Sequence, residues 1–103
     1  MRVRILTSAL DDLARGRAFY ERQAEGVGDY FFDSVFADID SLALYGGIHR
    51  QVFGYHRLLA RRFPFAIYYK MAPEAAVVYR VLDCRQNPAK ITRQLGRSAK
   101  HSR

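Results

Sequence analysis

The spacing of apolar residues changes from a strand period to a helical period within the first ten positions of the chain. Val3-Arg4-Ile5-Leu6 alternates as a short strand does. Thr7-Ser8 then offers a helix N-cap, with Asp11 three residues after Ser8. Apolar residues recur with helical spacing after this point, so we predict a first helix over residues 9–25.

A second helix is predicted after a short glycine-containing link. Gly26-Val27-Gly28 provides a left-handed stop and a tight turn, and Asp29 is placed to cap a helix that runs to about Leu44. Two helices joined by so short a link pack antiparallel as a hairpin. The predicted core stripes are Leu10, Leu13, Ala14, Tyr20 and Ala24 in the first helix, and Phe32, Val35, Phe36, Ile39, Leu42 and Ala43 in the second.

Beyond Gly46-Gly47 the pattern becomes strand-like, with β-branched and aromatic residues at short intervals. We predict strands over residues 53–61, 65–71 and 75–84 and a short last helix over 89–95, which Pro88 begins. Phe63-Pro64 fits a turn, because proline cannot donate a hydrogen bond inside a sheet. The predicted fold class is α+β in the order β-α-α-β-β-β(-α), with the helical hairpin packed on a mainly antiparallel sheet.

Alternation along the strand over 65–71 predicts its two faces. Phe65, Ile67 and Tyr69 form one stripe, which we expect to be buried against the helical hairpin, and Ala66, Tyr68 and Lys70 form the other. Exposure of Tyr68 beside Arg57 or Arg80 would favour RNA binding, since bases stack on aromatic side chains.

Length and composition indicate one domain. The chain has 103 residues, of which 50% are hydrophobic, enough for one modest core. We assign residues 1–96 to this domain and residues 97–103 to a basic, flexible tail. No apolar run approaches the roughly 18 residues that a bilayer span requires, so we expect a cytoplasmic protein without a membrane partner. Cys84 is the single cysteine, and we predict a buried strand residue there.

The formal net charge of +7 is unevenly distributed along the chain. Residues 11–40 hold eight acids against three arginines, whereas residues 50–103 hold twelve Lys and Arg against two acids. A basic half of this kind favours an acidic partner, either nucleic acid or a protein with clustered carboxylates.

Two adjacent segments carry a resemblance to a known family. They are Arg61-Arg62-Phe63-Pro64-Phe65-Ala66-Ile67-Tyr68-Tyr69 and the strand from Val77 that ends in Arg85-Gln86-Asn87-Pro88. With the Gly-Val-Gly link and the order of elements, they resemble RelE/ParE superfamily toxins, especially the plasmid-stabilisation, ParE-like branch. The resemblance covers roughly residues 3–91. It implies the toxin of a type II toxin–antitoxin system, neutralised by a small cognate antitoxin whose C-terminal segment wraps the toxin.

The resemblance leaves two host targets open. ParE-like members inhibit DNA gyrase by binding, whereas RelE-like members cut mRNA on the ribosome. Nuclease members place an arginine near the end of the last strand and a tyrosine or histidine just after it. Arg85 matches that arginine, but no tyrosine follows Tyr79, and Asp83 stands where many relatives have histidine. These departures favour a gyrase-binding toxin, with a ribosome-dependent mRNA endonuclease as the alternative.

The candidate site residues differ between the two functions. For mRNA cleavage, Arg57, Arg61 and Arg85 would stabilise the phosphate and His56 or Asp83 would transfer protons. For binding a target or antitoxin, guanidinium groups offer planar forks of donors to carboxylates and phosphates. The candidates are Arg57, Arg61, Arg62, Arg80 and Arg85.

Purely structural roles remain open for the same residues. Arg57 and Arg61 share a strand face by period two if the strand continues that far, but several arginines could simply solvate the sheet edge. Asp83 could form a structural ion pair with Arg57, and His56 could pack against the helices. Three scattered histidines and one cysteine make no metal-ligand set, and no glycine-rich phosphate loop is present. We therefore expect no metal and no cofactor.

Overall fold

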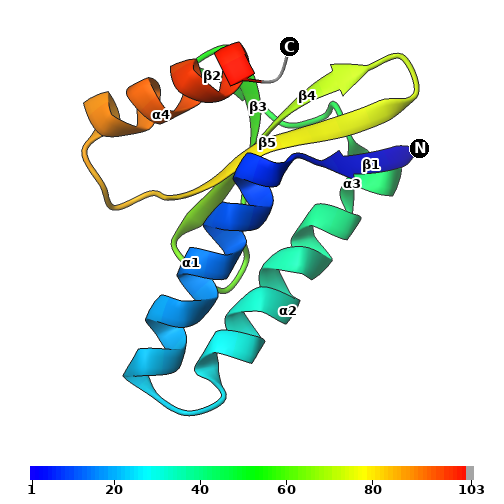
Figure 1. The fold of residues 1–103 in the computed structure, drawn as a ribbon. Coiled ribbons are helices and arrows are strands. Elements are labelled where there is room, and N and C mark those ends of the chain that lie inside the picture. Colours follow the sequence, from blue (N-terminus) through cyan, green and yellow to red (C-terminus); the bar gives the residue numbers. More distant parts are fainter. Residues whose placement is uncertain (102–103) are drawn as a thin grey trace.

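The protein folds as a helical hairpin packed on a five-stranded sheet, with a last helix on the other face of that sheet (Figure 1). The computed structural model describes the backbone of residues 1–101 and the side chains of residues 1–96. The elements are β1 (Arg2–Ile5), α1 (Thr7–Gln23), α2 (Val27–Asp40), α3 (Leu42–Tyr45), β2 (Gln51–Val52), β3 (Tyr55–Leu59), β4 (Phe65–Ala72), β5 (Ala75–Asp83) and α4 (Pro88–His101). This arrangement confirms the predicted α+β fold.

The sheet has the strand order β1-β5-β4-β3-β2. β1 runs parallel to β5, and every other neighbouring pair is antiparallel. β1 is short, and its last residue, Ile5, lies opposite Val78. The part of β5 from Tyr79 to Asp83 therefore extends beyond β1 and has no strand on its outer side.

The α1 helix buries a different stripe from the predicted one. Ala9, Asp12, Leu13 and Gly16 are buried, whereas Leu10, Ala14 and Ala24 are exposed. Ser8 is not a helix cap, because its hydroxyl donates to the Tyr79 carbonyl oxygen at 2.6 Å. The helix is thus rotated so that polar Ser8 and Asp12 face the sheet edge, which a pattern of apolar residues alone cannot indicate.

Glu21 caps the start of α2. Its carboxylate accepts hydrogen bonds from the backbone N–H groups of Gly26 and Gly28, both at 2.9 Å, which would otherwise lack partners at a helix N-terminus. Gly26 has a φ of 85°, the left-handed conformation that glycine adopts readily. The predicted cap, Asp29, lies inside the helix and forms an ion pair with Arg17.

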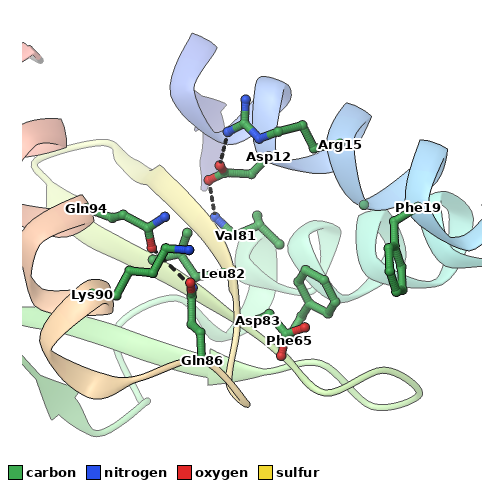
Figure 2. Close-up of a pocket in the computed structure, with 11 residues that line it drawn as sticks. Asp12, Arg15, Phe19, Phe65, Val81, Leu82, Asp83, Gln86, Lys90 and Gln94 are labelled. Carbon is green, nitrogen blue, oxygen red and sulfur yellow. Dashed lines mark hydrogen bonds and ion pairs between the residues drawn. The ribbon is translucent and has the colours of Figure 1, made fainter.

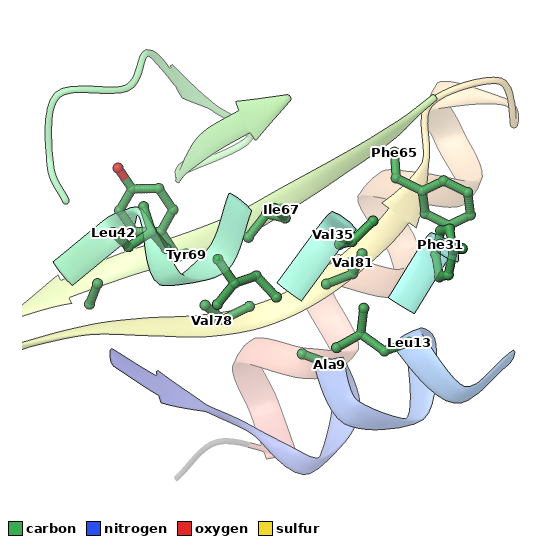
Figure 3. Close-up of a cluster of buried hydrophobic side chains, with 12 residues drawn as sticks. Ala9, Leu13, Phe31, Val35, Leu42, Phe65, Ile67, Tyr69, Val78 and Val81 are labelled. Atoms are coloured by element: carbon green, nitrogen blue, oxygen red, sulfur yellow. The ribbon is translucent and has the colours of Figure 1, made fainter. Parts of the chain in front are cut away.

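The main core lies between the hairpin and the sheet (Figure 3). Phe31 is fully buried and contacts Phe65 edge to face. Phe32 and Phe36, which the sequence assigned to the core stripe, are only partly buried and stack on each other. The α2 helix begins at Val27, after Gly26, and so starts three residues before the helix predicted to follow a cap at Asp29.

The predicted strand over 53–61 is instead a hairpin. Phe53 and Gly54 both have positive φ, 58° and 82°, which is the pattern of the tight turns that join two antiparallel strands. This turn separates β2 from β3, and β3 ends at Leu59. Residues 60–64 therefore form a loop rather than a continuing strand.

A β-bulge in β5 changes which side chains face the hairpin. Tyr68 lies opposite Arg80 and Tyr69 opposite Val78, so Tyr79 is an extra residue on β5. Because of this extra residue, Val78 and Val81 both pack into the main core although they are three positions apart. Arg80 and Leu82 consequently lie on the other face of the sheet.

The α4 helix creates a second core on that other face. Ile91 and Leu95 pack with Tyr55, Ala66, Tyr68 and Leu82. Tyr68 is therefore buried, and β4 is buried on both faces from Phe65 to Tyr69. The helix extends to His101, beyond its predicted end at 95, so residues 97–101 of the predicted tail are helical, and 102–103 lie outside the described residues. No described helix is both long and apolar enough to span a membrane.

Gly16 allows the close approach of α1 and α2, and we predict that Gly16→Ala destabilises the protein. A Cβ atom at Gly16 would lie 2.5 Å from ring carbons of Phe31, which is fully buried and cannot move aside. Overpacking of this kind costs about 1–3 kcal/mol. Urea denaturation should show a lower transition midpoint.

The matched control is Gly96→Ala in α4, where an added Cβ meets nothing within 4 Å. Alanine in an exposed helix position is favoured over glycine by roughly 0.5–1 kcal/mol, so this variant should be slightly more stable than the parent. Equal midpoints for Gly16→Ala and the parent protein would contradict the predicted close packing.

Candidate functional site

A buried ion pair between Asp12 of α1 and Arg80 of β5 lies at the point where these two elements meet α4. Arg80 donates to the Asp12 carboxylate from Nε at 2.7 Å and from Nη2 at 2.8 Å. Its Nη1 also donates to the backbone oxygen of Gln94 at 3.1 Å. The side chains are 4% exposed for Asp12 and 11% for Arg80. Arg80, predicted as a binding residue, therefore holds α1, β5 and α4 together.

The same carboxylate closes part of the outer edge of β5. The Val81 N–H donates to Asp12 Oδ2 at 2.9 Å, and the Ser8 hydroxyl donates to the backbone carbonyl oxygen of Tyr79. Side chains of α1 thus replace the strand that is missing beside this part of β5. The predicted core stripe of the first helix did not include Asp12. The spacing of Ser8 and Asp12, one helical turn apart beside Ala9 and Leu13, is the signal that could have identified them.

Arg57 and Arg61 do not share a face. Arg57 lies opposite Tyr68 on the α4 side of the sheet. Arg61 follows the end of β3 and lies on the hairpin side, where its backbone N–H donates to Asp38 Oδ2 at 3.0 Å. Arg61 and Arg62 line a hollow of about 290 Å³ against α2. The predicted shared strand face is absent because β3 ends before Arg61.

Asp83 pairs with Arg85 rather than with Arg57. Arg85 donates to it from Nε at 3.0 Å, from Nη2 at 2.7 Å and from its backbone N–H at 2.8 Å. The hydrogen bonds and charge of Arg85 lower the pKa of Asp83, while burial opposes that change. Asp83 in turn raises the pKa of Arg85. An aspartate held in this way is a poor proton acceptor for catalysis.

His56 lies on the hairpin side, opposite Tyr69. Its Nδ1–H donates to the His49 backbone oxygen at 2.7 Å, and its ring stacks on Tyr69. Asp83 lies opposite Phe65, four positions away along β4, or about 13 Å at the rise of a strand. The two predicted proton-transfer residues are therefore separated, and Arg57 lies on the opposite face from His56.

The α4 side of the sheet combines aromatic and basic side chains, and we call Tyr55, Arg57, Tyr68, Lys70 and Tyr79 the basic aromatic face. Lys70 Nζ lies 4.6 Å from the Tyr55 ring centroid and 5.5 Å from that of Tyr79, within cation–π range. Burial raises the pKa of Tyr68, and the hydrogen bond and charge of Arg57 oppose this rise. Because Tyr68 is buried, it does not provide the exposed stacking surface that would favour RNA.

His49 and Tyr69 anchor the loop between α3 and β2. The Gly47 N–H donates to the Tyr69 hydroxyl oxygen at 2.9 Å, and His49 Nδ1 lies 2.5 Å from the same oxygen. Because the Tyr69 hydroxyl oxygen accepts from the Gly47 N–H, the hydroxyl proton of Tyr69 can be donated to Nδ1 of a neutral His49. Burial and the nearby His56 both lower the pKa of His49, which favours this neutral form.

A groove of about 430 Å³ lies between α1, the end of β5 and the start of α4 (Figure 2). Phe19 and Arg15 come from α1, Val81, Leu82 and Asp83 from β5, and Lys90 and Gln94 from α4. Cys84, predicted to be buried, follows the end of β5 and is exposed. Among the side chains that the structure describes, no group of three His, Cys, Asp or Glu residues could hold a metal ion.

Comparison with known proteins identifies the fold. The structure is similar to a chain described as "Chromosomal ParDE TA system from P. aeruginosa", with a TM-score of 0.68 and 17% sequence identity. The match covers 79% of this chain and 92% of the other. The chain has a RelE/ParE-like fold. No protein-family model and no curated protein matches the sequence.

Asp12→Asn should destabilise this ParE-like fold strongly. The substitution leaves the buried Arg80 guanidinium without its counter-charge, which costs about 3–5 kcal/mol when one member of a buried pair is removed. The matched control is Asp83→Asn, which breaks a largely exposed pair and should lower the transition midpoint much less, since solvent screens such pairs. Urea denaturation of both variants measures the difference, and similar midpoints would show that the Asp12 pair is not structural.

The stability of the fold should depend on pH through His49. Its folded-state pKa is lowered from 6.5, so its stabilising contribution is present above pH 6.5 and is lost as pH falls through and below that value. His49→Gln should therefore lose less unfolding free energy than the parent between neutral and mildly acidic pH. Denaturation curves at several pH values test this, and an unchanged pH dependence in the variant would contradict it.

Proposed function

We propose that this protein is the toxin of a type II toxin–antitoxin system, a ParE-like protein that inhibits a host target by binding and is neutralised by a cognate antitoxin. DNA gyrase is the expected target. The ParE-like fold and the resemblance of the segments around Arg61 and Arg85 to this toxin family support the proposal. Such a protein acts in the cytoplasm, where gyrase is found.

The separation of the candidate proton-transfer groups is the observation that carries the choice of binding over mRNA cleavage. His56 is on the hairpin side and is engaged by His49, while Arg57 is on the α4 side. Asp83 forms an ion pair with Arg85 at the end of β5, opposite the first residue of β4, Phe65. General acid–base catalysis requires such groups within hydrogen-bond reach of one substrate, and this arrangement does not provide it.

The exposed arginines are the residues that we propose for target or antitoxin binding. Arg61 and Arg62 are exposed, and neither guanidinium has an ion pair among the described residues. They can therefore bind carboxylates without first losing an internal partner. Arg85 is also exposed but must release or share Asp83. Arg57 is part of the basic aromatic face, and Arg80 contributes indirectly, by holding β5 to α1 and α4.

An acidic antitoxin suits this surface. Its carboxylates would meet the basic half of the chain, and its apolar residues would cover exposed apolar side chains of the helices, such as Leu10 and Phe19. The attraction between opposite charges would also speed association.

Induction of the chain in a bacterial host without an antitoxin tests the function. We expect DNA synthesis, followed by pulse labelling, to stop before protein synthesis, because gyrase inhibition blocks replication first. Purified protein should also inhibit supercoiling by gyrase. Protein synthesis stopping first, with cleaved mRNA, would replace this proposal with the endonuclease.

A double variant, Arg61→Ala with Arg62→Ala, makes the same experiment specific to the surface. Hydrogen bonds to charged groups contribute about 1.5–3 kcal/mol each, so loss of two guanidiniums should weaken inhibition at least roughly tenfold. Both side chains are exposed, so the melting temperature should stay near that of the parent. The exposed pair Arg2→Ala with Arg4→Ala serves as a charge-matched control at another site, and full toxicity of the Arg61/Arg62 double variant would exclude these two residues from the binding surface.

A further inference from the structure

The outer edge of β5 ends in main-chain groups for which the described residues supply no hydrogen-bond partner. In an antiparallel pair, both backbone groups of a residue point the same way, and the direction alternates from one residue to the next. The Val81 N–H points away from β4, toward Asp12. The Val81 carbonyl oxygen and both backbone groups of Asp83 therefore also point away from β4. Within the described residues, no hydrogen bond reaches these three groups.

The residues that carry these groups, Val81 and Asp83, line the groove between α1 and α4 (Figure 2). β1 would cover them if it continued past Ile5, but the chain turns into α1 at Thr7. The groove therefore occupies the position of a strand that is missing from the sheet. Its volume of about 430 Å³ is enough for a few residues of an extended chain.

The two sides of the groove differ in chemistry. Phe19, 43% exposed, lies with Phe65 on the hairpin side. Lys90, which is exposed, lies with Leu82 on the α4 side. A strand placed beside β5 would alternate its side chains between these two sides. Apolar residues would meet Phe19, and residues between them would meet Lys90.

The charges around the groove favour an acidic occupant. Its two carboxylates are already neutralised, Asp12 by Arg80 and Arg15, and Asp83 by Arg85. Lys90 has no ion pair among the described residues. The cations thus outnumber the anions at this site, and the unpaired one stands where alternate side chains of an added strand would point.

We propose that an extended segment with alternating apolar and acidic residues, supplied by a partner protein, adds to the outer edge of β5 as a short strand. It would bond the Val81 oxygen and the backbone groups of Asp83. The identification of that partner as the antitoxin rests on the proposed function, but the site itself rests on the unpaired edge and the groove.

The test uses a synthetic eight-residue peptide of alternating glutamate and valine as the probe. Titration of the purified protein, followed by amide NMR and hydrogen exchange, should shift and protect the Asp83 amide. Asp83→Pro removes the N–H that points away from β4 and no hydrogen bond within the sheet, because proline is tolerated where a strand N–H faces outward. The matched control, Asp83→Ala, loses the same carboxylate but keeps the N–H.

We expect Asp83→Pro to bind the probe about tenfold more weakly than Asp83→Ala, the effect of losing one main-chain hydrogen bond together with strand alignment. Equal binding by the two variants, shifts confined to other surfaces, or no binding would overturn the proposal. If Asp83→Pro fails to fold, Lys90→Glu decides: it should prefer a lysine–valine peptide over the glutamate–valine probe, and an unchanged preference would overturn the proposal.

These outcomes are separate from the proposed function. Loss of toxicity or of gyrase inhibition leaves the peptide measurement unaffected, because the probe contains no target. A toxin that inhibits gyrase but does not bind the probe would keep its function and lose this site.

Discussion

The Asp12–Arg80 ion pair is the interaction on which the arrangement of the other elements depends. β1 is too short to cover β5, so the second half of β5 would present an open edge inside the fold. Asp12 closes that edge at Val81 and at the same time binds Arg80. Arg80 also donates a hydrogen bond to the backbone oxygen of Gln94 and so connects α4 to the pair. One buried carboxylate therefore fixes the positions of α1, β5 and α4 relative to one another.

This arrangement also determines which chemistry the surface can support. The bulge at Tyr79 places Arg80 on the α4 side, and α4 then covers Tyr68. Burial removes the tyrosine that could have stacked on a base, and the end of β3 at Leu59 sends Arg61 to the hairpin side. The arginines are distributed over three places instead of surrounding one substrate. This distribution is what supports the proposed binding function over proton transfer.

The groove beside β5 follows from the same short β1. Ser8 and Asp12 bond the Tyr79 carbonyl oxygen and the Val81 N–H at the strand edge. The part of the chain that the structure describes offers no hydrogen-bond partner to the Val81 carbonyl oxygen or to the backbone groups of Asp83. Unpaired strand edges are usually protected, because they can pair with another chain. Here the edge is recessed between two helices, and the basic side chain of Lys90 lies beside it. Under our proposal, only an extended and acidic segment fits this edge.

The sequence by itself determined the fold class, the helical hairpin, the positions of β1, β4 and β5 along the chain and the basic second half. These features depend on local periodicity, turn residues and composition, which can be read within a few positions of each residue. Tertiary structure alone decided the burial of Asp12 and Tyr68, the pairing of Arg80, and the separation of His56 from Asp83. Each of these depends on which strands lie side by side, on the extra residue at Tyr79 and on the helix that covers the second face. The physical reason is that a strand pattern shows which side chains share a face, whereas what covers that face is set by residues far away in the chain.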